Sequence, residues 1–346
     1  MAAENEVSRR SAEKSEGEPP EQVAQALVDR AYALLDQRQY EELLSLSGEV
    51  ILLLGGAREE GVRVQVAQAF IGKAIALGQL ERFEECLSTC NEALRHLDGA
   101  NHGKLRELMA KVQFHKAHAL MNLSQPPAAL ALAGELLQQH DGSSERELQV
   151  VVAGALLIKA DALVEVGQLE DGLRLYDETF QRFSGAGDAV LRYQAGLALL
   201  SRALHLRLLN RPHEALSTYD TLFDRFGAET DSSVRERVTE ALNDAGAVLI
   251  SEAKQRWAQK RDQALAFLER ASAKISAALE RQPRSSSALW NAGYIAFLLG
   301  KRDQARSLLA ESLQIGGEQQ RSRGLQGGAL SPIPEDEELR ALVGSL

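Results

Sequence analysis

Hydrophobic residues recur along this chain with a long and regular period. A leucine stands every forty-three residues, at Leu34, Leu77, Leu120, Leu163, Leu206 and Leu249. A small residue precedes each leucine by three positions, at Ala31, Ala74, Ala117, Ala160, Ala203 and Gly246. Such self-similarity is typical of a solenoid, in which each repeat buries its apolar face only against neighbouring repeats.

Within one period, the apolar spacing predicts two helices joined by a short break. In the second repeat, Phe70, Ala74 and Leu77 fall on one face of a helix. A break follows at residues 78–81, and Cys86 and Cys90 then begin the apolar stripe of a second helix. Short polar segments with Gly or Ser, such as residues 141–143, separate one helix pair from the next.

The pattern divides the chain into three parts. Residues 1–20 lack periodic hydrophobics, so we expect a disordered tail there. Residues 21–315 predict an all-α, right-handed α-solenoid of about seven helix-turn-helix repeats. Residues 316–346 are expected to form a loop and a short C-terminal capping helix or tail. The predicted repeats lie near residues 24–66, 67–109, 110–152, 153–195, 196–238, 239–285 and 286–315.

The sixth repeat departs from the period. Gly246 and Leu249 keep the spacing, but the small residue of the second helix, Ala264, comes six positions late. Residues 252–261 contain neither Gly nor Pro, so nothing in the sequence ends a helix there. Two interpretations remain open at this point, a longer helix pair or a drift of the pattern toward the end of the array.

The spacing resembles that of the tetratricopeptide repeat, in a variant with a period of about 43 residues. The last repeat matches most closely, with the run from Ala288 to Tyr294 (ALWNAGY), then residues 299–301 (LGK) and Ala305. The small residue of the second helix recurs at Leu43, Cys86, Ala129, Gly172 and Ala215, although Leu43 is large. HEAT and armadillo repeats also have this length, but the short break inside each repeat favours the tetratricopeptide pattern.

This resemblance implies a concave groove, lined by the first helices, that binds an extended peptide or a helix. The corresponding positions are Val28, Tyr32, Ile71, Ile75, Phe114, His118, Leu157, Asp161, Leu200 and Leu204. Most are apolar, which suits a hydrophobic peptide or an amphipathic helix. The Asn and Lys residues with which some family members clamp a C-terminal carboxylate are largely missing here.

A row of cations accompanies the small residues of the first helices. It consists of Arg30, Lys73, Lys116, Lys159 and Arg202, each one position before the small residue. Stacked repeats would place these side chains in line, where they could bind an acidic strand. Alternatively, each aliphatic stem covers the core while its charge reaches a carboxylate or a helix end. We favour this packing role.

Composition and motifs narrow the function classes. The formal net charge of −10 argues against nucleic acid as a partner. His115, His118 and Asp161 form the one cluster that could begin a metal or catalytic site, but no further ligand completes it. Cys86 and Cys90 lie on a buried stripe and are expected to be core thiols. We find no phosphate loop, nucleophile elbow or dinucleotide fingerprint, and we expect no metal, cofactor or enzymatic activity.

These observations predict an interaction protein. The leading hypothesis is a non-enzymatic scaffold that binds a peptide or an amphipathic helix of another protein in its groove. The alternative is a regulatory adaptor or peptide sensor whose solenoid changes shape on binding. Neither a signal peptide nor a membrane span is visible, so we expect no membrane partner and a cytoplasmic location. The sequence does not indicate the oligomeric state.

Overall fold

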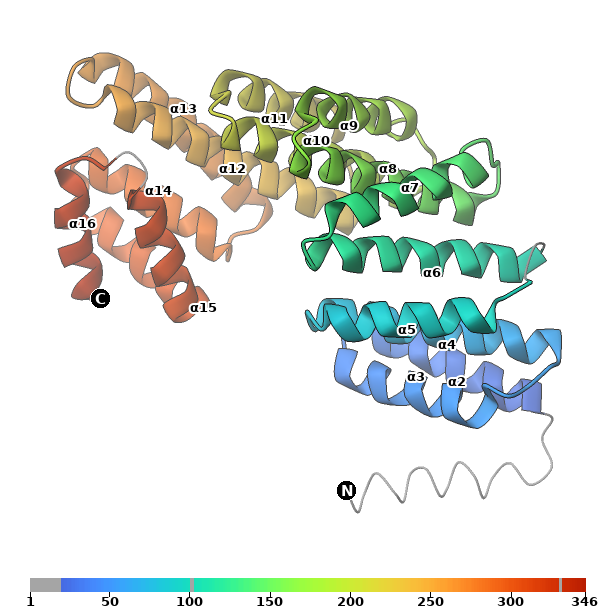
Figure 1. Cartoon of the computed structure of the whole chain (residues 1–346). Coiled ribbons are helices and arrows are strands. Elements are labelled where there is room, and N and C mark those ends of the chain that lie inside the picture. The colour runs from blue at the N-terminus through green and yellow to red at the C-terminus, as the bar shows by residue number, and fades with distance from the viewer. Residues whose placement is uncertain (1–19, 100–102, 330–331) are drawn as a thin grey trace. The chain divides into compact units, whose positions relative to one another are not determined.

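A computed structural model describes residues 20–99, 103–329 and 332–346, and this part of the chain contains helices and no strand (Figure 1). The chain divides into two compact units, residues 1–175 and 176–346. The expected N-terminal tail lies outside the described residues, except that Pro20 already begins the first described helix. None of the described helices is both long and apolar enough to cross a membrane.

The first unit is a stack of helix pairs. Its helices are α2 (Pro20–Asp36), α3 (Tyr40–Leu54), α4 (Glu60–Gln79), α5 (Phe83–His96), α6 (Gly103–Asn122), α7 (Pro126–His140) and α8 (Arg146–Glu165). The first helices of successive pairs touch one another, α2 with α4, α4 with α6 and α6 with α8. Helix α9 (Leu169–Phe183) begins in this unit and ends in the second.

The second unit continues the same plan, with one pair of longer helices. It contains α10 (Ala189–Leu208), α11 (Pro212–Phe226), α12 (Ser232–Arg256), α13 (Arg261–Arg281), α14 (Ser286–Leu298), α15 (Arg302–Ala329) and α16 (Glu335–Gly344). The pair α12 and α13 has 25 and 21 residues, against 20 and 15 in α10 and α11. The irregular sixth repeat is therefore a longer helix pair.

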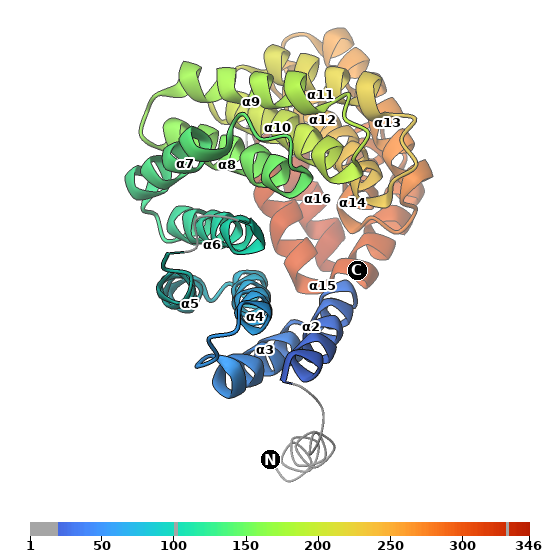
Figure 2. The same cartoon turned by 90° about the vertical axis from the view of Figure 1, so that its right-hand side faces the viewer.

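The C-terminal segment differs from the expected loop. Helix α15 runs to Ala329 and bends at Gly317, whose combination of φ 55° and ψ −150° only a glycine adopts readily. The part after the bend returns to α14, where a Cβ on Gly324 would lie 2.0 Å from the Trp290 indole. Gly324 therefore permits this part of α15 to pack closely against α14. The expected short helix at the end does form, as α16 (Figure 2). It buries Leu339 and Val343.

The turn inside each of the first five pairs has one backbone conformation. Residues with positive φ recur every forty-three positions, at Arg38, Glu81, Ser124, Gly167 and Asn210. The next amide donates a hydrogen bond to the carbonyl of the periodic leucine, as from Arg82 to Leu77 at 2.9 Å. This is the Schellman arrangement, which satisfies carbonyls at a helix end. Each of these leucines thus ends a first helix as well as packing in the core.

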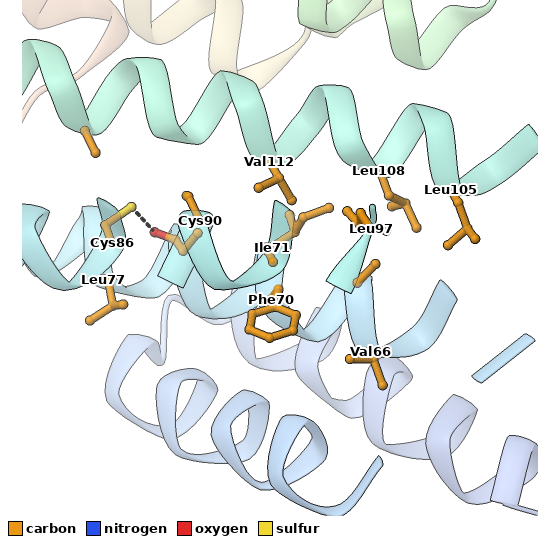
Figure 3. Packing of buried hydrophobic residues seen from close by; sticks show 14 of the residues in the cluster. Val66, Phe70, Ile71, Leu77, Cys86, Cys90, Leu97, Leu105, Leu108 and Val112 are labelled. Carbon is orange, nitrogen blue, oxygen red and sulfur yellow. Dashed lines mark hydrogen bonds between the residues drawn. The ribbon is translucent and has the colours of Figure 1, made fainter. Parts of the chain in front are cut away.

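The small residues of the period lie where helices approach closely. Ala74, Ala117, Ala160 and Ala203 are at most 2% exposed. Around Ala74, a core forms between α4, α5 and α6, with Phe70 and Leu77 among its members (Figure 3). Both free cysteines belong to this core, where the hydrogen bond with Cys86 and burial raise the pKa of the Cys90 thiol. Apolar burial of this kind is the main stabilising contribution in a helical stack.

Candidate functional site

The ten predicted groove residues separate into two rows. Each first helix contributes two of them, four positions apart. The earlier one points inward, since Val28, Ile71, Leu157 and Leu200 are buried. Phe114 is half-buried and lies against the backbone of Gly154, where a Cβ would come within 2.4 Å of its ring. These five side chains pack between helices. They are therefore not available to contact a ligand on the groove surface.

The second member of each pair reaches the surface. Tyr32 is 51% exposed and Leu204 is 40% exposed, while His118 is exposed and Ile75 and Asp161 are half-buried. Tyr32, Ile75, His118 and Asp161 come from α2, α4, α6 and α8, the first helices of successive pairs in the first unit. The crevice beside Tyr32 and Ile75 measures only about 30 Å³. That is room for about one water molecule, so a ligand on this face would lie along the surface.

The histidine cluster has the features of packing. Burial, together with the nearby His118 and Lys111, lowers the pKa of His115 to about 4, so its ring is neutral at pH 7. Its ring meets that of Phe114 edge-on at 5.2 Å, and the ring of His118 meets Phe83 in the same way at 6.4 Å. Among the described residues, no group of three or more His, Cys, Asp or Glu side chains is placed to hold a metal ion.

Two members of the cation row, Arg202 and Lys73, interact with residues on the second helices of the repeats. Arg202 of α10 forms an ion pair with Asp177 of α9 at 2.9 Å and donates a hydrogen bond to Thr218 of α11. Lys73 lies close enough to Glu85 of α5 to lower the pKa of that carboxyl, although Arg82 has the larger effect. Lys73, Lys116 and Lys159 are half-buried and Arg30 is exposed. These contacts favour the packing role.

A much larger hollow lies within the second unit. It has a volume of about 680 Å³, and its walls come from the end of α10, the start of α11, and α12, α14, α15 and α16. Its apolar lining includes Leu208, Val248, Ile250, Trp290 and Leu339. Its polar lining includes Arg207, Asn210, Ser251, Gln255, Asn291, Gln320 and Arg323. This mixture of apolar surface and a few polar groups is typical of ligand-binding pockets.

The hollow continues the predicted groove by two repeats. Leu204 follows the small residue Ala203, and in the same way Ala247 follows Gly246 and Tyr294 follows Gly293. Ala247 and Tyr294 line the hollow, as do Leu208 and Ser251 one helical turn further on. The groove residues predicted from the sequence end with Leu204 in the fifth repeat and do not include these residues. The spacing of the small residues would have located Ala247 and, through the last repeat, Tyr294.

Charges in the hollow are unevenly compensated. Glu252 pairs with Arg256 at 2.8 Å, and Lys254 pairs with Asp336 at 3.0 Å. Within the described part of the chain, Arg207 and Arg323 form no ion pair. The hollow therefore offers two guanidinium groups that form no ion pair among the described residues, although the charge of Arg207 acts on nearby Asp244. Guanidinium groups of this kind bind carboxylates through paired hydrogen bonds.

Asp244 of α12 titrates at an unusual pH. Burial raises its pKa to about 6, with the charge of Arg207 opposing and that of Glu240 adding to the rise. An unfolded Asp titrates near pH 3.9, so between about pH 4 and pH 6 the folded chain binds the proton more tightly. The contribution of Asp244 to stability therefore falls as pH rises through this window, and its ionised form destabilises the fold at neutral pH.

Replacing Asp244 with Asn is accordingly expected to raise the free energy of unfolding by about 1–2 kcal/mol near pH 7.5. The gain should shrink toward zero as the pH falls to about 4, because the wild-type carboxyl is then protonated too. Urea denaturation of both chains at several pH values measures the difference. Asp224→Asn, at an exposed position of α11, is the matched control. If Asp244→Asn raised the free energy of unfolding equally at every pH, the raised pKa of Asp244 would not be the cause.

Comparisons with known proteins identify the fold. No family model matches the sequence, and no curated protein matches it. Among solved structures, the apo form of RapI has a TM-score of 0.60 and 13% identity, over 94% of this chain and 86% of that chain. NprR in complex with its cognate peptide NprX has a TM-score of 0.51 and 12% identity, over 99% and 93%. A tetratricopeptide repeat protein from Parabacteroides merdae has a TM-score of 0.50 and 10% identity, over 89% and 98%. The chain has the tetratricopeptide-like helical repeat fold.

Proposed function

We propose that this protein is a non-enzymatic scaffold that binds a peptide or an amphipathic helix of another protein, with the hollow of the second unit as its main site. The observation that carries the proposal is the hollow itself, because about 680 Å³ is typical of pockets that enclose a ligand. It is formed by the inner faces of α10, α12 and α14, which belong to successive repeats. An extended ligand could thus touch several repeats at once.

The lining indicates the chemistry of the ligand. Leu208 is 71% exposed at the edge of the hollow, and covering it would remove apolar surface from water. Arg207 precedes it, and Arg323 lies in another wall. A peptide that presents one apolar side chain and one carboxylate would satisfy both kinds of group. The surface row of the first unit, in which Tyr32 and His118 are exposed and Ile75 and Asp161 half-buried, is proposed as a second surface for such a ligand.

An enzymatic role has little support in this hollow. Glu252 is engaged by Arg256 and Lys254 by Asp336, so neither is placed as a general base in the structure. We propose a cytoplasmic protein that uses no cofactor and binds neither nucleic acid nor membrane. The alternative, a peptide sensor that changes shape, draws support from the similarity to NprR, which is described with its cognate peptide.

Selection of peptides from a random display library on the full chain tests the proposal without a known partner. Enriched peptides are expected to bind Leu208→Glu about ten-fold or more weakly than the wild-type chain, since a carboxylate would replace the apolar contact and repel the ligand. Leu52→Glu is the matched control, because Leu52 is 85% exposed on α3. Its affinity should stay within about two-fold of wild type. If both variants bound the peptides equally weakly, or if Leu208→Glu bound them as well as the wild-type chain, the hollow would not be the binding site.

A charge at Leu157 would be a poor test of the groove. Leu157 is 6% exposed in α8 and packs between helices. A glutamate there would bury an unpaired charge and unfold the repeat, so lost binding would report lost structure. Exposed positions such as Leu204 and Leu208 avoid this ambiguity.

A further inference from the structure

Helix α16 is attached to the second unit through a buried ion pair. The Lys254 ammonium of α12 lies 3.0 Å from Oδ2 of Asp336, and the two side chains are 2% and 4% exposed. Tyr294 of α14 donates its hydroxyl hydrogen to the other carboxylate oxygen of Asp336. The backbone N–H of Ile333 donates to Oδ2 at 2.9 Å. The carboxylate of α16 is thus satisfied from two other helices and from its own approach segment.

A ring of further polar contacts surrounds this pair. The Trp257 indole N–H donates to Oε1 of Glu335 at 2.6 Å. Arg302 pairs with Glu338 at 2.6 Å. The guanidinium of Arg261 lies 3.4 Å from the centre of the Trp257 ring and 3.8 Å from Glu335. Each of these contacts joins α16 to a side chain from a different helix or turn.

The charges of the two surfaces are complementary. Four acidic residues, Glu335 to Glu338, form the first turn of α16. The surface that receives them contributes Lys254, Arg261 and Arg302. The apolar part of the contact is narrow, with Leu339 and Val343 as the buried residues that follow in α16. The surface therefore selects an acidic helix with one buried carboxylate followed by apolar residues three and seven positions later.

A buried ion pair adds little net stability to a helix that only caps the array. Desolvation of both charges offsets most of their attraction, and apolar residues of similar size often stabilise equally well or better. Such pairs contribute more to the choice of partner than to affinity. The chemistry of this contact is that of a selective docking surface.

We infer that the surface of α12, α14 and α15 beneath α16 is a docking site for an acidic amphipathic helix, and that α16 is its resident occupant. A partner helix with the pattern Asp-x-x-Leu-x-x-x-Val competes with α16 for this surface. Lys254, Tyr294 and Leu339 also line the hollow, so exchange of α16 alters one of its walls. The inference rests on the contacts of α16 and is independent of what the hollow binds.

The test uses the full chain and a fluorescent synthetic peptide with the sequence of residues 332–346. In the Asp336→Asn chain, α16 loses its ion pair and vacates the surface. This chain is expected to bind the peptide about ten-fold or more tightly than the wild-type chain, which still holds α16. Glu337→Gln is the matched control, because Glu337 is exposed on the same turn and carries the same charge. It should behave as wild type.

Two further measurements decide between a docked occupant and a fixed cap. A peptide carrying Asp336→Asn is expected to bind the opened chain about ten-fold more weakly. Hydrogen exchange of the wild-type chain should show α16 amides exchanging about a hundred-fold faster than those of α14, because the helix leaves without unfolding the array. Exchange as slow as in α14, or equal peptide binding by all three chains, would overturn the inference.

Discussion

Replacing Phe70 with alanine is expected to lower the free energy of unfolding of the first unit by about 3–5 kcal/mol. The Phe70 side chain is 1% exposed and lies in the core between α4, α5 and α6 (Figure 3). Its ring also meets that of His96, with centres 5.1 Å apart. Removal of the ring loses its transfer free energy and leaves a cavity that helices on several sides cannot fill.

The loss should be local as well as large. In a repeat array each repeat contacts only its neighbours, so the defect is expected to reduce hydrogen-exchange protection in α4 to α6 and leave α12 to α14 unchanged. Urea denaturation followed by circular dichroism gives the size of the loss. Leu53→Ala, at a position 63% exposed on α3, should change stability by less than about 0.5 kcal/mol. A uniform loss of protection along the chain would argue against independent repeats.

Replacing Gly172 with alanine is expected to destabilise the first unit by about 2–3 kcal/mol, although alanine favours helix over glycine. A Cβ at this position would lie 2.6 Å from Cγ2 of Val164 and 2.8 Å from the carbonyl oxygen of Ala160. The second of these is backbone of α8, so it cannot move aside as a side chain can. Steric overlap therefore outweighs the gain in helix propensity of about 1 kcal/mol.

Gly134 provides the matched control for this change. It lies inside α7, and a Cβ there would meet nothing within 4 Å. Gly134→Ala should therefore stabilise the chain by up to about 1 kcal/mol, through helix propensity alone. The pair of variants is compared by urea denaturation. If both glycines gave the same sign, packing at Gly172 would not be the deciding effect.

Much of the fold was predictable from the spacing of leucine and small residues. Leu77 illustrates why, because the same residue packs in the core and accepts the hydrogen bond that ends its helix. Because packing and the helix-ending hydrogen bond both depend on this position, the leucine recurs at the same place in each repeat. The tight contact at Gly172 was not predictable to the same degree, since Ala129 and Ala215 occupy the equivalent positions as buried alanines. The sequence indicated a small residue there, but not how closely α8 approaches.

The candidate site was predictable only in part. The period located the first helices, but it could not separate inward residues such as Leu200 from surface residues such as Leu204, because both are leucine. The walls formed by α15 and α16 were beyond its reach. The part of α15 after Gly317 and the whole of α16 follow the last repeat and have no counterpart in the others, so no spacing could place Arg323 or Leu339 beside Trp290.

The shared turn conformation has a consequence for the length of the array. Residues 38, 81, 124, 167 and 210 have the same left-handed backbone and join the same two kinds of helix. Removing or duplicating a stretch of forty-three residues between two such turns recreates an identical junction, with no new backbone geometry to accommodate. Gene segments of that size can therefore be gained or lost by recombination while the remaining junctions stay intact. The length of the array can therefore change by whole repeats, while the C-terminal helices stay at one end.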